Sequence, residues 1–209
     1  MKKKINYLFK IIKEEKNLLR FIMILFIIGI IAGSLFTNFI NVNDRKIIVG
    51  EITEYFNEIK KLTSLVYGID YFKSLIINNY VQIAILYFLG ISLIGGVLVI
   101  LIIFFKGFLL GTTLSAIIMK YKIKGIIGCV LYLIPGYILN IFVYFFITLY
   151  IFNASTKFAK ALFKKENLNF KTFLGKYLLS FIIGILFISL TSLIESYISP
   201  LILKLLTKF

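Results

Sequence analysis

The sequence predicts an all-α polytopic membrane protein, a five-span helical bundle with one external amphipathic helix. Apolar residues make up 60% of the 209 residues, and the mean hydropathy of +0.99 lies far above that of a soluble domain. They gather in long runs, and roughly 20 apolar residues are enough for a helix to cross about 30 Å of hydrocarbon. A soluble core of this composition would leave large apolar patches in water.

The formal charge of +15 indicates a membrane surface rather than nucleic acid. Lys and Arg lie mainly at the ends of the apolar runs and in short loops, where they meet anionic headgroups and set topology. No basic face with interleaved aromatic residues is present. Cys129, the single cysteine, stands in an apolar run and is predicted to be a small core residue.

The N-terminal segment is predicted to stay in the cytoplasm and to lead into the first span. Residues 1–20 carry seven Lys and Arg against two Glu, directly before an apolar run. Residues 21–37 form span one, and a cleaved signal peptide is the alternative interpretation of this run. Gly29, Gly33 and Thr37 recur every four residues, so another helix can approach this face closely.

Residues 38–80 are predicted to form an external loop, because five basic and five acidic residues balance within it. Residues 51–67 show the three-to-four spacing of an amphipathic helix. This helix either packs on the membrane or bundle end, or docks an external partner. The candidate partner-binding residues form its apolar face: Ile52, Phe56, Ile59, Leu62 and Val66.

The next two spans are predicted at residues 81–105 and 107–119, with a turn near Lys106. One helix over residues 81–119 would be nearly twice the length that the hydrocarbon core needs. Span three is short, so it either crosses a thinned bilayer or is re-entrant. Lys106 either pins the turn at the cytoplasmic interface or meets an anionic lipid or partner. The predicted packing and hairpin residues are Gly90, Gly95, Gly96, Lys106, Gly107 and Gly111.

Residues 125–150 are predicted to form span four, interrupted at Pro135. Pro135 and the nearby Asn140 form either a kink whose polar groups are satisfied or a polar break that lines a pathway. Residues 151–176 form a basic cytoplasmic loop with six Lys and one Glu. Residues 177–198 form span five, with Glu195 near the interface, and residues 199–209 form the tail.

Two topologies compete, and the count of basic residues favours the one with five spans. Five spans place fourteen Lys and Arg in the cytoplasm and ten outside, whereas four spans give thirteen and eleven. Four spans would also place the loop with six Lys outside. The N-terminus is therefore predicted to be cytoplasmic and the C-terminus external.

The residues that most enzyme sites need are missing from the sequence, so we expect no catalytic activity, cofactor or metal. There is no His for a zinc protease motif or a general base, and no nucleotide-binding loop. Asp44 and Asp70 both lie in the predicted external loop, so no pair of intramembrane aspartates can form.

Several short motifs resemble the stage II sporulation protein M family over nearly the whole chain. They are Phe72 and Asn79, the 89–92 and 94–95 stretches, residues 104–107 with Gly111, and residues 135–140. The wider superfamily carries Asn, His and Glu where this chain has Lys106, Gly136 and Asn140. These departures remove ionisable groups that a proton pathway would use.

Membership implies a non-enzymatic scaffold of forespore engulfment in the mother-cell membrane at the septum. Such a scaffold holds the peptidoglycan-degrading engulfment proteins D and P in place, and membrane lipids are its other partners. A small transporter or channel subunit, or a permease half that pairs with an ATPase, is the alternative. Few polar residues are expected to face one another across the spans, which argues against transport. Homo-oligomerisation stays open.

Overall fold

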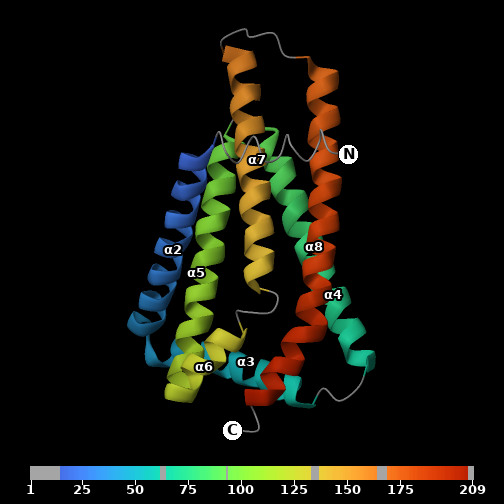
Figure 1. Ribbon diagram of the computed structural model, residues 1–209. Coiled ribbons are helices and arrows are strands. Elements are labelled where there is room, and N and C mark those ends of the chain that lie inside the picture. The colour runs from blue at the N-terminus through green and yellow to red at the C-terminus, as the bar shows by residue number, and fades with distance from the viewer. Residues whose placement is uncertain (1–14, 62–64, 93, 133–136, 164–168, 207–209) are drawn as a thin grey trace.

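The computed structural model describes residues 15–61, 65–92, 94–132, 137–163 and 169–206. Within these residues the chain is helical and contains no strand (Figure 1). The helices are α2 (Lys16–Phe39), α3 (Val42–Lys61), α4 (Leu65–Gly90), α5 (Gly95–Tyr121), α6 (Ile123–Tyr132), α7 (Ile138–Phe163) and α8 (Phe170–Leu206).

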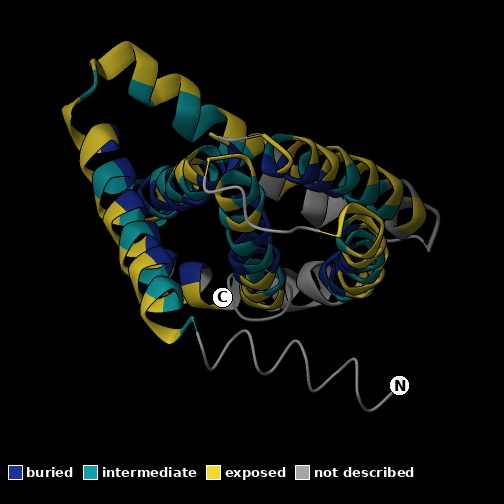
Figure 2. Ribbon diagram, turned by 90° about the horizontal axis from the view of Figure 1, so that it is seen from above, coloured by how far each residue is buried: buried dark blue, intermediate teal, exposed yellow. Residues whose placement is uncertain are grey.

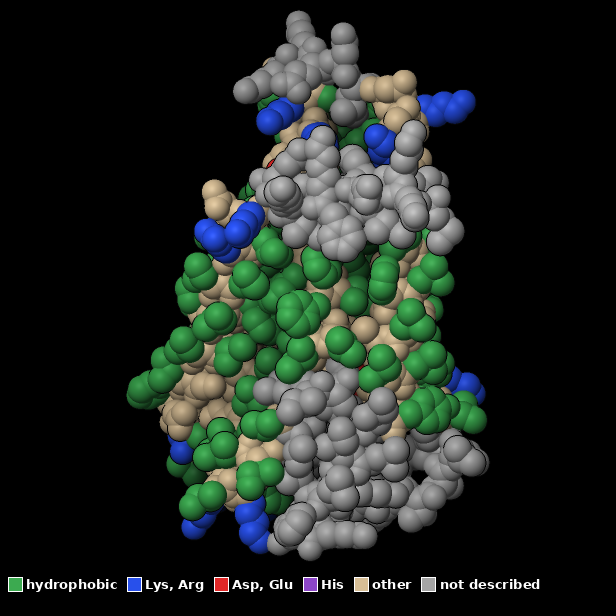
Figure 3. Space-filling model, in the orientation of Figure 1, with side chains coloured by type: hydrophobic (Ala, Val, Ile, Leu, Met, Phe, Trp, Pro, Cys, Tyr) green, Lys and Arg blue, Asp and Glu red, His purple; other side chains and the backbone are tan. Residues whose placement is uncertain are grey.

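Five of these helices are long and apolar enough to cross a membrane, which confirms the predicted all-α polytopic fold. They are α2, the Tyr71–Gly90 part of α4, α5, α7 and the Phe170–Tyr197 part of α8. The start of α2 and the end of α8 lie at opposite ends of the bundle (Figure 1). On the face shown in Figure 3, hydrophobic side chains cover the middle of the described part of the molecule, with Lys and Arg above and below it. This is the pattern of a bilayer-spanning surface.

Helix α3 lies across one end of the bundle, together with α6, and contacts α5 and α8 (Figure 1). We call this the α3 end. The Arg45 guanidinium donates to the carbonyls of Asn38 and Ile40, the second at 3.3 Å, and so fixes the corner between α2 and α3. The predicted amphipathic helix over residues 51–67 is displaced, because α3 ends at Lys61. Val66 belongs to α4 instead.

The predicted turn at Lys106 is wrong, because α5 runs unbroken through it for 27 residues. The segments 81–105 and 107–119 are therefore not separate spans, and span three is not short. The chain turns between α4 and α5, where the Ser92 amide and hydroxyl donate to the Leu89 carbonyl at 2.9 and 2.7 Å. A Cβ at Gly95 would overlap that carbonyl, so only glycine fits there. Lys106 stays inside the helix because its ammonium finds partners within the bundle.

The predicted fourth span over residues 125–150 is also wrong. The 10-residue α6 occupies its first part at the α3 end, and the spanning helix is α7. Pro135 lies outside the described residues. The predicted loop over residues 151–176 is largely helical, since α7 and α8 both extend into it. Phe158 and Phe173 stack with ring centroids 6.4 Å apart and join the two extensions.

Buried residues lie mostly on the inward sides of the helices and exposed residues on the outward sides (Figure 2). Helices α2 and α5 approach most closely at Gly29, Gly33, Gly107 and Gly111, which we call the α2–α5 seam. A Cβ at Gly33 would overlap the Phe108 backbone, and the other three glycines face similar backbone contacts. Two backbones therefore touch along this seam, as small residues permit in membranes.

Two further glycines predicted as packing positions lie against side chains rather than backbone. A Cβ at Gly90 would meet the side chains of Ile151 and Tyr177, and one at Gly96 would lie 3.1 Å from the Phe152 ring. These glycines make room for α7 and α8 near the turn between α4 and α5.

Candidate functional site

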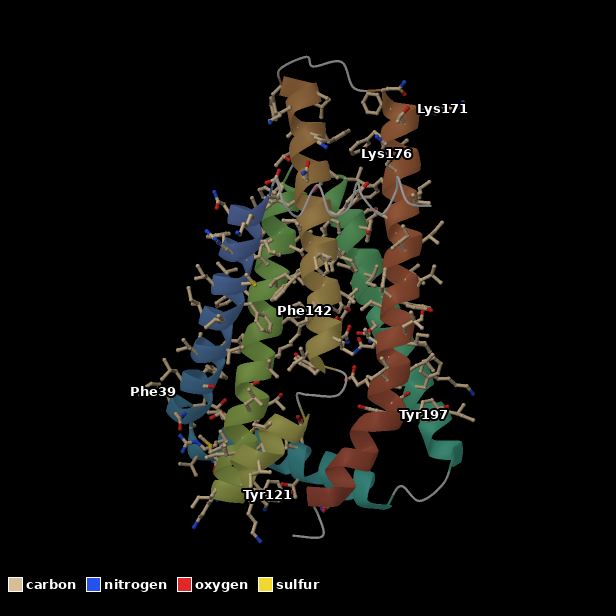
Figure 4. The ribbon with its side chains drawn as sticks, viewed as in Figure 1. Phe39, Tyr121, Phe142, Lys171, Lys176 and Tyr197 are labelled. Carbon is tan, nitrogen blue, oxygen red and sulfur yellow. The ribbon has the colours of Figure 1, made fainter. Side chains whose placement is uncertain are left out.

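Seven polar side chains from four helices meet inside the bundle. Asn79 and Gln82 come from α4, Lys106 from α5, Asn140 and Tyr144 from α7, and Ser192 and Glu195 from α8. We call this group the interior cluster. Figure 4 shows side-chain nitrogen and oxygen atoms gathered between the lower half of α7 and α8. The expectation that few polar residues face one another across these helices is therefore wrong.

Lys106 provides the positive charge of the interior cluster. Its Nζ donates to Gln82 Oε1 at 2.5 Å and lies 3.7 Å from the centroid of the Tyr144 ring. A cation over an aromatic face gains energy in a desolvated setting. Lys106 lies near the middle of α5, so it does not pin a turn at the interface.

The Tyr144 hydroxyl links α7 to α4, and Asn79 extends the link to α8. The Tyr144 side chain is 1% exposed, and its hydroxyl lies within donating distance of Gln82 Oε1 at 3.0 Å and Asn79 Oδ1 at 3.3 Å. Asn79 Nδ2 in turn donates to Ser192 Oγ at 2.9 Å. Buried polar groups in a bilayer need such partners, because lipid supplies none.

Glu195 provides the negative charge and is buried, which corrects the predicted position near the interface. Helix α8 continues to Leu206, so Glu195 does not end the helix. Asn140 Nδ2 donates to Glu195 Oε2 at 3.4 Å, and Lys106 interacts with the carboxylate electrostatically. The bundle therefore holds a cation and an anion in the same interior, an arrangement that marks functional sites in membrane proteins.

The Asn140 side chain is only partly satisfied. The residue is 8% exposed, and its Oδ1 has no hydrogen-bond partner in the part of the chain that the structure describes. Asn140 lies in the first turn of α7. The kink predicted at Pro135 lies outside the described residues, so both sequence interpretations for this position stay predictions.

The hydrogen bonds continue along the contact between α4 and α8. Tyr80 and Ser189 share a hydrogen bond of 2.7 Å, the Tyr87 hydroxyl donates to Ser180 Oγ at 3.2 Å, and the Tyr177 hydroxyl donates to the Tyr87 carbonyl at 2.7 Å. Sequence reasoning missed this contact. Its signal was the three-residue spacing of polar residues at Ser189, Ser192 and Glu195 on an otherwise apolar helix.

The structure tests the predicted site residues of the external loop only in part. Ile52 is half-buried on α3. The side chains of Phe56, Ile59, Leu62 and Val66 lie outside the described residues. No group of three or more metal-ligating side chains occurs in the described ranges.

The fold and the interior cluster define a multi-pass helical membrane protein whose spans are fastened by both close packing and buried hydrogen bonds. The chain belongs to the stage II sporulation protein M family, whose model matches residues 22–200. The resemblance seen in the sequence is thereby confirmed, and the protein is a membrane protein of sporulation. No curated protein and no solved structure matches the chain.

Proposed function

We propose that the protein is a non-enzymatic scaffold of the engulfment machinery, which anchors peptidoglycan-degrading proteins at the septal membrane. The observation that supports this proposal best is the position of α3. The helix is held against α5 and α8 at one end of the bundle, so its outward face has a fixed place relative to the membrane. A fixed surface of this kind suits the positioning of another protein.

The outward face of α3 combines apolar and acidic groups. Five of its exposed residues follow one helical stripe, namely Asn43, Ile47, Glu51, Glu54 and Asn57, and Val42, Asp44 and Lys46 are exposed beside it. Ile47 is 61% exposed, which is large for an apolar side chain beside acidic neighbours. We propose this stripe as the surface that receives the engulfment proteins D and P.

The proposal requires the α3 end to lie on the side of the membrane away from the cytoplasm. Residues 1–20 and 151–176 together carry thirteen Lys and Arg against three acidic residues, which favours the cytoplasm for these segments. In a Cys129→Ser background, Glu54→Cys should react with a membrane-impermeant maleimide in intact cells. Lys171→Cys at the opposite end should react only after permeabilisation (Figure 4). The reverse pattern would contradict this orientation.

The docking surface is tested by Ile47→Asp. We expect this variant to insert into the membrane normally and to lose co-purification of proteins D and P from sporulating cells, because a charge replaces the exposed apolar side chain. Phe163→Asp is the matched control. Phe163 is the last residue of α7, is 77% exposed and lies at the end of the bundle opposite α3. If Ile47→Asp and Glu54→Lys both retain the partners, α3 is not the docking surface.

A further inference from the structure

Helix α6 runs back beside the last part of α5. A Cβ at Gly125 would lie 2.7 Å from the Ile117 carbonyl oxygen, and the Cys129 thiol donates to the Leu114 carbonyl at 3.5 Å. Later residues of α6 therefore contact earlier residues of α5, so the two helices are antiparallel. Because α5 is long and apolar enough to span a membrane, α6 re-enters the half of the bilayer at the α3 end.

The side of α6 that faces away from α5 carries an apolar stripe. Its members recur with the three-to-four spacing of one helix face, and each is between 49% and 80% exposed. We call them the α6 stripe: Ile123, Ile126, Ile127 and Val130. The small residues Gly125 and Cys129 pack on α5 instead. Helix α6 therefore turns its larger apolar side chains away from the rest of the protein.

Three lysines lie at the corner where α5 ends and α6 begins. Lys120, Lys122 and Lys124 are all exposed, and we call them the corner lysines. Tyr121, which lies among them in the sequence, is at the lower edge of the molecule in Figure 4. The positive charge therefore stands at the membrane-surface end of the α6 stripe, where lipid headgroups lie.

Lys122 has a backbone conformation that favours glycine. Its φ is 53° and its ψ is −127°, and it is the non-glycine residue with a positive φ in the described ranges. Its amide donates to the Ile118 carbonyl at 2.8 Å, and its carbonyl accepts from the Gly125 amide at 2.9 Å. Glycine would fit this corner without strain. A lysine held in such a conformation is typical of a functional position.

We propose that the corner lysines and the α6 stripe bind an anionic phospholipid of the leaflet at the α3 end. The ammonium groups attract the phosphate of the headgroup, and the acyl chains cover the stripe. A phospholipid matches this surface, because it carries its charge at one end of an apolar length. A symmetric second copy of the chain would instead bring its own corner lysines against these, and like charges repel.

The lipid surface is independent of the proposed docking surface. It includes no residue of α3, and the variant Ile47→Asp tests the docking of proteins separately. Failure of either proposal would leave the other untouched.

Fluorescence quenching in vesicles measures the contact. Ile127→Cys in the Cys129→Ser background carries bimane, a fluorophore that bromine quenches on contact, and Ile126→Cys replaces it if the first variant does not fold. The vesicles contain equal amounts of phosphatidylcholine and phosphatidylglycerol, and one of the two lipids is brominated on its acyl chains. We expect phosphatidylglycerol to be enriched about fivefold at α6, the factor for the attraction of one lysine to an anionic surface. Bimane at Leu186, which is 60% exposed on α8, is the reference.

Two triple variants assign the preference to the corner. Replacing the corner lysines should make the two lipids quench equally: Lys120→Gln/Lys122→Gln/Lys124→Gln. The matched control removes three exposed lysines at the opposite end of the bundle and should keep the preference: Lys157→Gln/Lys160→Gln/Lys171→Gln.

Three results would overturn the proposal. Absence of quenching by both lipids would mean that protein covers the α6 stripe. Equal quenching by the two lipids with the corner lysines in place would mean that the corner does not select a headgroup. A preference that survives the loss of the corner lysines would arise elsewhere on the protein.

Discussion

The α2–α5 seam and the interior cluster hold neighbouring helices together in different ways. Along the seam the backbones themselves touch, and a side-chain hydrogen bond, from Ser34 to the Gly111 carbonyl at 3.1 Å, crosses between the helices. In the interior cluster the helices stand far enough apart for Lys106, Tyr144 and Glu195 to fit between them. The α2–α5 seam depends on glycines, which have no side chain, whereas the interior cluster depends on polar side chains.

This difference follows from the membrane as a solvent. Lipid tails are as apolar as leucine, so burying apolar surface between two spans gains little, and close packing or buried hydrogen bonds must hold the helices. The seam should therefore tolerate no added atoms, whereas the interior cluster should tolerate no lost partner. Four substitutions of decreasing expected effect test this contrast.

Lys106→Met should have the largest effect. It removes the cation that donates to Gln82 Oε1 and leaves the buried Glu195 without its nearby positive charge, and leaving a buried charge uncompensated costs about 3–5 kcal/mol. The loss would be measured by unfolding the protein in detergent while a thiol-reactive fluorogenic dye reports exposure of the buried Cys129 thiol. The double variant Lys106→Met/Glu195→Gln should be more stable than the sum of the two single variants, and strict additivity would show that the two charges do not interact.

Gly33→Leu should come next, at about 3 kcal/mol, because a side chain there would push against the backbone of Phe108. The same unfolding measurement applies. Gly175→Leu is the control, since a Cβ at Gly175 has nothing within 4 Å. Equal losses at the two positions would mean that the close approach of α2 to α5 contributes little to stability.

Ser192→Ala should cost about 1 kcal/mol, because it leaves Asn79 Nδ2 without its acceptor. Ser196→Ala is the control on the same helix, since its hydroxyl donates at 3.1 Å to the nearby Leu193 carbonyl and not to another helix. Both variants would be unfolded side by side. A larger loss in Ser196→Ala would contradict the role assigned to the contact between α4 and α8.

Gly50→Ala should have the smallest effect and the opposite sign. A Cβ at Gly50 meets nothing within 4 Å, and alanine favours a helix over glycine by about 0.5–1 kcal/mol. The Tm should rise slightly. A loss like that of Gly33→Leu would show that α3 packs more closely at this point than its open surroundings indicate.

The number of spans, the family and some contact faces could be predicted from the sequence alone. Span number follows from the length of apolar runs relative to the bilayer, which is a local property of the chain. The four-residue spacing of Gly29 and Gly33, and of Gly107 and Gly111, indicated close-packing faces in the same way. The identity of the facing helix was beyond local spacing, because it depends on how the spans are arranged.

The position of the turn and the surroundings of the charges are properties of the packed bundle. Hydropathy counts Lys106 as a break in an apolar run, since a lone lysine in lipid is costly. Its cost is offset by Gln82, 24 residues earlier, and by the Tyr144 ring on a third helix. Glu195 was misplaced for the same reason. The free energy of a buried charge depends on partners that are distant in the chain, and only tertiary packing brings those partners together.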